Sequence, residues 1–184
     1  EPSRRVFAGE WNELFVPTKA TVGGFKPAIK HRTPSWGQRT PFNDLAPMIN
    51  GKRAVAGCVP LAMSMLCKFY EYPAKGKGNL PSYTYEPESG GSQTISGYEL
   101  GHTYNWAKMK MEYKSYTDEE AAAVAQLVYD CGVMAQVTFD SSTSGNINTM
   151  ARKVIEYFGF DASAVGVRSE ERRVGKEGRS RWSP

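Results

Sequence analysis

The apolar positions along the chain predict three helices, and the most apolar of them spans 58–70. Pro60 falls in its first turn, where a missing N–H is no loss, and Pro73 lies just beyond its end. The apolar residues that recur on one face at helical spacing are Ala62, Met65, Leu66 and Phe69. Because only Ser64 and Lys68 interrupt the apolar character, we expect this helix to be covered on most of its sides.

The second helix carries signals for both of its ends. Thr117 is followed three residues later by Glu120, the pattern of a capping box, so we expect the helix to begin at Asp118. Gly132 is expected to close it. Apolar and polar residues then alternate through 133–139, which predicts a β-strand.

The third helix is expected over 147–158, where apolar residues again recur at helical spacing and Gly159 follows. Elsewhere the chain is rich in turn residues. Asn-Gly at 50–51 predicts a tight turn, and the Gly- and Ser-rich stretch 74–97 predicts a surface loop with a short strand near 83–85. Helices with a few short strands indicate an α+β fold.

Composition and charge exclude several classes of protein. The chain has 184 residues, 40% of them hydrophobic, which is enough for one globular domain with a real core. Of the formal charge of +4, residues 168–184 supply +3, from five Arg and one Lys against three Glu. We therefore expect no nucleic-acid partner. No apolar run approaches the roughly 18 residues that span a bilayer, so we expect no membrane segment either.

The three cysteines differ in what they can do. Cys58 and Cys67 are nine residues apart on the predicted helix, about 13 Å along its axis, which is too far for a disulfide. Whether Cys131 pairs with either is left open. Cys58 begins the helix, where free N–H groups and the helix dipole favour the thiolate, the form that attacks carbonyls. The alternative for Cys58 is a small buried apolar residue.

A series of short segments bears on whether Cys58 is a nucleophile or a buried apolar residue. They are Trp36-Gly37-Gln38-Arg39-Thr40-Pro41-Phe42-Asn43, Gly57-Cys58-Val59-Pro60, Tyr72-Pro73-Ala74-Lys75-Gly76, Thr103-Tyr104-Asn105-Trp106, Asp130-Cys131-Gly132, Ser144-Gly145 and Tyr157-Phe158-Gly159-Phe160-Asp161. In this order they resemble the streptopain family of secreted bacterial cysteine peptidases, over residues 34–167. The resemblance implies a papain-like fold, polypeptide substrates cleaved by a Cys–His pair, no cofactor or metal, and a secreted or periplasmic location.

The resemblance also implies roles for particular residues. Cys58 would be the nucleophile, with its own N–H as one oxyanion donor, and the Gln38 amide would be the second donor. The alternative for Gln38 is a surface residue in a turn. Ser144 and Gly145 would line the substrate cleft and pair with an extended peptide, and the alternative for them is an ordinary turn.

The base of the Cys–His pair has no evident candidate. The histidines are His31 and His102, and His102 follows Cys58 by only 44 residues. In papain-like enzymes the histidine lies roughly 130–150 residues beyond the cysteine, on a β-rich half. The chain ends 126 residues after Cys58, so we assign neither histidine as the base. We expect mainly the helical amino-terminal half of a peptidase, with the β-rich half mostly absent and no activity in this fragment alone.

The ends of the chain receive separate interpretations. Residues 1–33 are expected to be the end of a pro-segment and a linker, with an integral arm as the alternative, and Glu1 to be an internal cut. Residues 34–167 form the partial peptidase domain. Residues 168–184 lack apolar periodicity and resemble a translated sequencing adaptor, differing at Gly178, so we expect a non-native tail after a gene cut short near Val167. A charged interaction tail is the alternative.

Two other functions remain open at this stage. One is a papain-like amidase that acts on the peptide crosslinks of cell walls, and the other is a non-catalytic module that only binds peptides. In a peptidase half without its partner, we also expect an uncovered apolar face on the cysteine helix and self-association through it.

Overall fold

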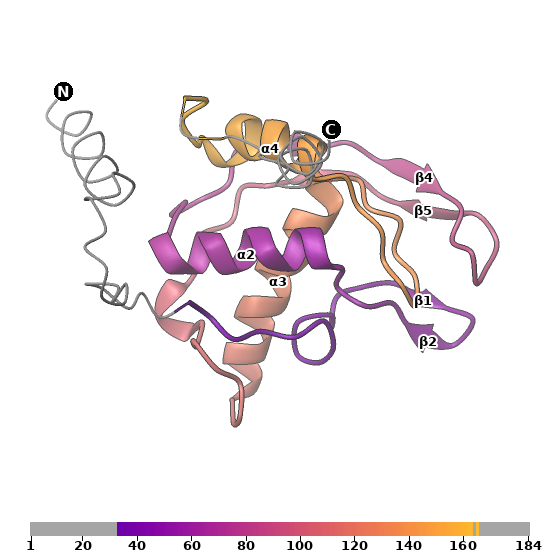
Figure 1. The fold of residues 1–184 in the computed structure, drawn as a ribbon, viewed down its shortest axis with the longest axis horizontal. Helices are drawn as coiled ribbons and strands as arrows, with labels where there is room; N and C mark the ends of the chain where they lie inside the picture. The colour runs from indigo at the N-terminus through magenta and orange to yellow at the C-terminus, as the bar shows by residue number, and fades with distance from the viewer. Residues whose placement is uncertain (1–32, 164, 166–184) are drawn as a thin grey trace, which may run out of the picture. The chain divides into compact units, whose positions relative to one another are not determined.

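The computed structural model describes residues 33–163 and 165, and the elements follow the order shown in Figure 1. The helical elements are α2 (Cys58–Tyr70), the 3-10 helix η1 (Trp106–Lys108), α3 (Asp118–Met134), α4 (Ile147–Lys153) and the π-helix η2 (Val154–Phe158). The strands are β1 (Met48–Ile49), β2 (Lys52–Arg53), β3 (Asn79–Leu80), β4 (Tyr83–Tyr85), β5 (Gln93–Ile95) and β6 (Tyr98–Glu99). The α+β class expected from the sequence is confirmed.

Helix α2 has the predicted bounds but buries a different face from the one expected. Its end is formed by Glu71, which has a left-handed conformation and donates its backbone N–H to carbonyls of the last turn. The buried positions are Pro60, Leu61, Met63, Ser64, Cys67 and Lys68. Leu66 is 44% exposed. The expectation that the helix is covered on most sides is therefore wrong.

Two polar residues lie on the buried face of α2 because each finds partners there. The Ser64 hydroxyl donates to the Pro60 carbonyl one turn back, at 2.8 Å. The Lys68 ammonium donates to the Glu71 carboxylate at 2.7 Å and to the Trp106 carbonyl at 2.9 Å. A paired polar group can be buried without the penalty of a lost hydrogen bond.

Helix α3 begins as predicted and ends later. Thr117 accepts from the Glu120 N–H while the Glu120 side chain accepts from the Thr117 N–H, so the capping box is confirmed. The helix runs past Gly132 to Met134, so the prediction that Gly132 closes it is wrong. A Cβ at Gly132 would lie 2.7 Å from the Phe139 ring, so glycine is needed here for close packing.

The strand predicted over 133–139 is also wrong. Its first two residues belong to α3, and the chain then turns at Gln136, whose φ is 50°. What remains of the strand is one antiparallel bridge, between Thr138 and Ser144. The alternating apolar residues are nevertheless buried, because the segment enters the core beside the end of α3.

The third predicted helix is confirmed, in two parts. Helix α4 is capped by Asn146, whose side chain accepts from the N–H groups of Asn148 and Thr149, and continues as η2. Gly159, with φ 71°, ends it as expected.

The sheets are small and antiparallel. Strands β1 and β2 form a hairpin around the predicted tight turn at Asn50-Gly51, where both residues have positive φ. Strand β4 pairs with β5, and β3 pairs with β6. In Figure 1 the hairpins β1–β2 and β4–β5 extend to the same side of the helices. Helices α2 and α3 are in direct contact with each other.

The predictions for residues 1–32 and 168–184, including His31, lie outside the described residues. Within the described part of the chain, no helix is both long enough and apolar enough to cross a membrane.

Candidate active site

Cys58 is the first residue of α2 and is exposed. The chain reaches it through Gly57, which has φ 88° and precedes the helix. A Cβ at Gly57 would lie 2.7 Å from the Thr143 side chain, in a backbone conformation that L side chains rarely adopt. Glycine at this turn thus lets the helix start against the Thr143 segment with its first side chain in solvent.

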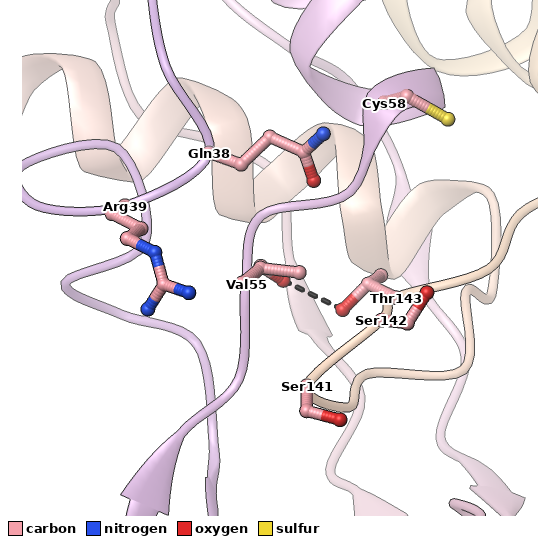
Figure 2. Close-up of a pocket in the computed structure, with 7 residues that line it drawn as sticks. All are labelled: Gln38, Arg39, Val55, Cys58, Ser141, Ser142 and Thr143. Carbon is pink, nitrogen blue, oxygen red and sulfur yellow. Dashed lines mark hydrogen bonds between the residues drawn. The ribbon is translucent and has the colours of Figure 1, made fainter.

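Gln38 is held beside the same turn. Its backbone carbonyl accepts a hydrogen bond from the Ala56 N–H at 2.9 Å. The two residues that the sequence assigned to nucleophile and oxyanion donor line one pocket of about 380 Å³. The complete lining is Gln38, Arg39, Val55, Cys58, Ser141, Ser142 and Thr143. Figure 2 shows Gln38 and Arg39 reaching toward the segment before Cys58, with Ser141 to Thr143 on the other side.

Thr143 ties the two sides of this pocket together. Its hydroxyl donates to the Val55 carbonyl at 2.6 Å and accepts from the Asp140 N–H at 3.0 Å. The Val55 N–H donates in turn to the Asp140 carbonyl at 3.0 Å. The backbone N–H and carbonyl of Val55, three residues before Cys58, are therefore both hydrogen-bonded to the turn that begins at Asp140.

The turn at 140–143 is itself anchored by the Asp140 carboxylate. That carboxylate accepts from the Ser89 hydroxyl and N–H and from the Ser141 N–H. Hydrogen bonding, from the Ser89 hydroxyl foremost, lowers the pKa of Asp140. Thr143 and Asp140 were not predicted from the sequence, because nothing in their local pattern shows that the turn packs beside Gly57.

Ser144 and Gly145 line a second pocket, of about 390 Å³, together with Thr138 and residues at the start of α4. Ser144 exchanges two backbone hydrogen bonds with Thr138, at 2.9 and 3.1 Å. A Cβ at Gly145 would lie 3.5 Å from the side chain of Val59, the neighbour of Cys58. The structure therefore places these residues close to the start of α2, although not in the pocket that Cys58 lines.

His102 does not line the Cys58 pocket. Its Nε2 lies 2.7 Å from the carboxylate of Asp130, which is fully buried on α3. The same carboxylate accepts hydrogen bonds from the Tyr98 and Tyr104 hydroxyls, each at 2.7 Å, and from the Gln126 amide at 2.9 Å. The hydrogen bond to Asp130 raises the pKa of His102, with burial acting in the opposite direction. His102 is thus engaged in the packing of α3.

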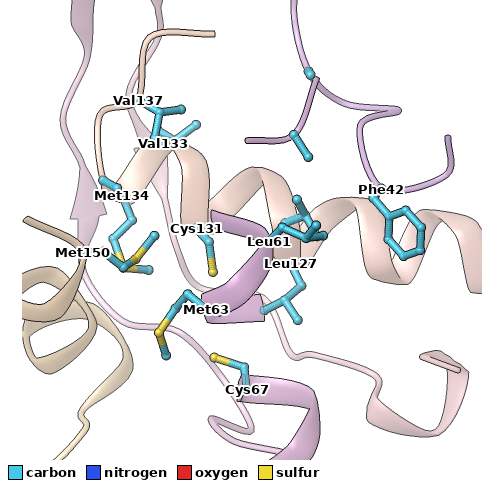
Figure 3. Close-up of a cluster of buried hydrophobic side chains, with 14 of the residues drawn as sticks. Phe42, Leu61, Met63, Cys67, Leu127, Cys131, Val133, Met134, Val137 and Met150 are labelled. Atoms are coloured by element: carbon cyan, nitrogen blue, oxygen red, sulfur yellow. The ribbon is translucent and has the colours of Figure 1, made fainter. Parts of the chain in front are cut away.

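The other two cysteines are in the core. Cys67 on α2 and Cys131 on α3 are both unexposed and unoxidised. Figure 3 shows them on the facing sides of the two helices, among Leu61, Met63 and Leu127. Burial, followed by the neighbouring Cys131, raises the pKa of the Cys67 thiol well above its usual range. Among the described cysteines Cys58 is therefore the accessible thiol.

No cluster of three or more metal-binding side chains occurs within residues 33–163.

Known proteins share this arrangement of elements. The structure of active interpain A cysteine protease from Prevotella intermedia superposes with a TM-score of 0.63 at 28% identity, covering 78% of this chain and 61% of that one. A prointerpain A fragment from the same organism gives 0.60 at 26% identity, covering 85% and 52%. The fold is therefore papain-like, as the sequence resemblance implied.

Sequence relatives agree with the structural ones. The thiol protease/hemagglutinin PrtT of Porphyromonas gingivalis is 30% identical over 122 residues, and streptopain of Streptococcus pyogenes is 26% identical over 159 residues. The match covers 65% of this chain but 14% of PrtT, and 75% of this chain but 39% of streptopain. Residues 36–178 match the peptidase C10 family, so the chain belongs to that family of cysteine-type peptidases.

Proposed function

We propose that this chain is the nucleophile-bearing part of a cysteine endopeptidase. The observation that carries the proposal is that an exposed Cys58 begins α2 and shares a pocket with Gln38. The relatives named as proteases support it. No feature of the described residues favours a cell-wall amidase or a non-catalytic peptide-binding module.

In this proposal the Cys58 thiolate attacks the carbonyl carbon of a peptide bond, and a thioester forms. The negative oxygen of the tetrahedral intermediate accepts hydrogen bonds from the Cys58 N–H and from the Gln38 amide. Departure of the amine needs a proton, which a partner imidazole supplies as general acid. His102 is not available as that imidazole, because its Nε2 lies 2.7 Å from the Asp130 carboxylate.

Ser144 and Gly145 are proposed to hold the substrate backbone. Ser144 uses its N–H and carbonyl in the bridge to Thr138. Gly145 is exposed, and an extended peptide is proposed to pair with its backbone as an added strand.

The experiment compares the three thiols and then joins this chain to the downstream half of a relative. Cys58 should react with iodoacetamide at least tenfold faster than Cys67 and Cys131, followed by mass spectrometry of peptides, because only Cys58 is exposed. The 184-residue chain alone should not hydrolyse casein. Joining residues 1–167 to the downstream half of a close relative should restore proteolysis, and Cys58→Ala should abolish it. A restored enzyme that tolerates Cys58→Ala, or fragment activity that disappears with His102→Ala, would overturn the proposal.

We also propose that the chain self-associates through the exposed face of α2. Leu66 and Tyr70 there are 44% and 41% exposed, and Ile147 at the start of α4 is 56% exposed. Sedimentation velocity at rising concentration should show association that Leu66→Glu weakens, and a strictly monomeric wild-type chain would contradict this. The full protein is proposed to act outside the cytoplasm, in a secreted or periplasmic location, which fractionation of the producing cells tests.

A further inference from the structure

The polar side chains that line the pocket beside Cys58 offer mainly hydrogen-bond donors. Arg39 is the charged side chain in its lining, and its guanidinium has no carboxylate or other side-chain partner among the described residues. Figure 2 shows that the Arg39 side chain extends toward Val55 rather than away from the pocket. An arginine carries five N–H donors and no acceptor.

The serines on the opposite wall add further donors. The hydroxyls of Ser141 and Ser142 have no side-chain hydrogen bond within the described part of the chain, so both can turn toward a ligand. The Thr143 hydroxyl, in contrast, is already used between Val55 and Asp140. The free polar groups of this wall therefore suit a ligand rich in acceptors.

Asp140, the carboxylate next to Ser141 in the sequence, does not neutralise Arg39. Asp140 directs its oxygens to Ser89 and to the Ser141 N–H, and these bonds already partner both oxygens. Asp140 also does not line the pocket. The positive charge of Arg39 is thus left for a group that enters from outside.

We infer that this pocket selects a substrate with an acidic side chain on the residue that supplies the attacked carbonyl. The inference rests on the proposed function, since it takes Cys58 as the nucleophile. In this inference the side chain of that residue enters the pocket that Cys58 lines, where its carboxylate would meet the Arg39 guanidinium, with Ser141 and Ser142 on the opposite wall. Arginine binds a carboxylate through two parallel N–H donors, which gives direction as well as attraction.

The test uses peptidyl acyloxymethyl ketones that are identical except for Glu, Gln or Lys next to the ketone. The Cys58 sulfur attacks the methylene carbon, a thioether forms, and the acyloxy group leaves as a carboxylate with the bonding electrons. Rates on the 184-residue chain are followed by intact mass and divided by the rate with iodoacetamide, which has no side chain to bind. This ratio removes any change in the intrinsic reactivity of the thiol.

Wild type should react about fivefold faster with the Glu reagent than with the Gln reagent, and the preference should fall as salt is raised, as expected for a partly exposed ion pair. Arg39→Gln should remove the preference, and Arg39→Glu should reverse it in favour of Lys. Lys52→Gln, which removes an exposed charge on β2 outside the pocket, should leave the preference intact.

Equal rates for the three reagents, or faster reaction with Lys, would overturn the inference while leaving Cys58 as the nucleophile. A Glu preference that survives Arg39→Gln would also overturn it. Peptidyl reagents that fail to label Cys58 would instead contradict the proposed function, and the inference would fall with it.

Discussion

The buried carboxylate of Asp130 gives the sharpest test of what holds α3 in place. It accepts four hydrogen bonds, two on each oxygen, from Tyr98, Tyr104, His102 and Gln126. These donors come from β6, from the segment between β6 and η1, and from α3 itself. Asp130 is fully buried, so water cannot replace any donor that is lost.

Asp130→Asn keeps the shape of the side chain but changes what it can accept. The one oxygen of asparagine can keep two of the four donors, and its amide group then faces the other two. Hydrogen bonds to a charged acceptor contribute roughly 1.5–3 kcal/mol each, so two lost bonds destabilise the fold by about 3 kcal/mol at the low end of that range. The Tyr104 hydroxyl and the His102 ring can turn to accept, which is why we use the low end.

The assay is urea unfolding at neutral pH, followed by circular dichroism. With a slope of about 2 kcal/mol/M, the midpoint should fall by about 1.5 M. Asp118→Asn is the control on the same helix, because Asp118 is exposed in the first turn and loses only a dipole interaction of about 0.5 kcal/mol. An Asp130→Asn midpoint within about 0.5 M of the Asp118→Asn midpoint would refute the reasoning.

Three further predictions follow from the same contacts. The hydrogen bond to Asp130 raises the pKa of His102, so the contribution of His102 to stability is complete below about pH 6.5 and is lost as pH rises through the raised value. The urea midpoint of wild type should therefore fall more between about pH 6 and pH 9 than the midpoint of His102→Gln, and parallel curves would contradict this. Thr143→Val leaves the buried Val55 carbonyl and Asp140 N–H without their partner and should lower the free energy of unfolding by about 2 kcal/mol. Thr143→Ser keeps the hydroxyl and should lower it by about 1 kcal/mol or less, and equal losses would mean that the hydroxyl does not matter. Deletion of 168–184 should leave the thermal melting curve unchanged, and a loss of more than about 1 kcal/mol would show that the segment packs and is not an artefact.

The sequence by itself determined the features that depend on a few neighbouring residues. The capping box at Thr117 and the helix end at Gly159 were predicted correctly, because each is set by hydrogen bonds or φ within one turn of chain. The bounds of α2 and the position of Cys58 at its start were also predictable, from apolar spacing and the Gly57 turn.

Only the tertiary structure decided which surfaces meet. The buried face of α2 carries Ser64 and Lys68; Pro60 and Glu71 are partners within one turn, and Trp106 is the partner from a distant segment. No apolar pattern shows such pairing, so the choice of face could not be read from the chain.

Gly132 and the segment after it were misread for the same reason. A glycine near a helix end is typical of a cap, but here it is required by the Phe139 ring that packs on it from beyond the turn. The alternation through 133–139 marks burial in the core and not pairing in a sheet, since hydrogen bonding between strands depends on a partner elsewhere in the chain.

The residues of the candidate site also divide into those predicted from the sequence and those seen only in the structure. Cys58, Gln38, Ser144 and Gly145 were assigned as candidates from short segments, and the structure brings the first two into one pocket. Thr143 became visible only when residues 88 positions apart proved to be hydrogen-bonded. A local sequence pattern carries no record of such a contact, because the contact forms only when distant segments pack against each other.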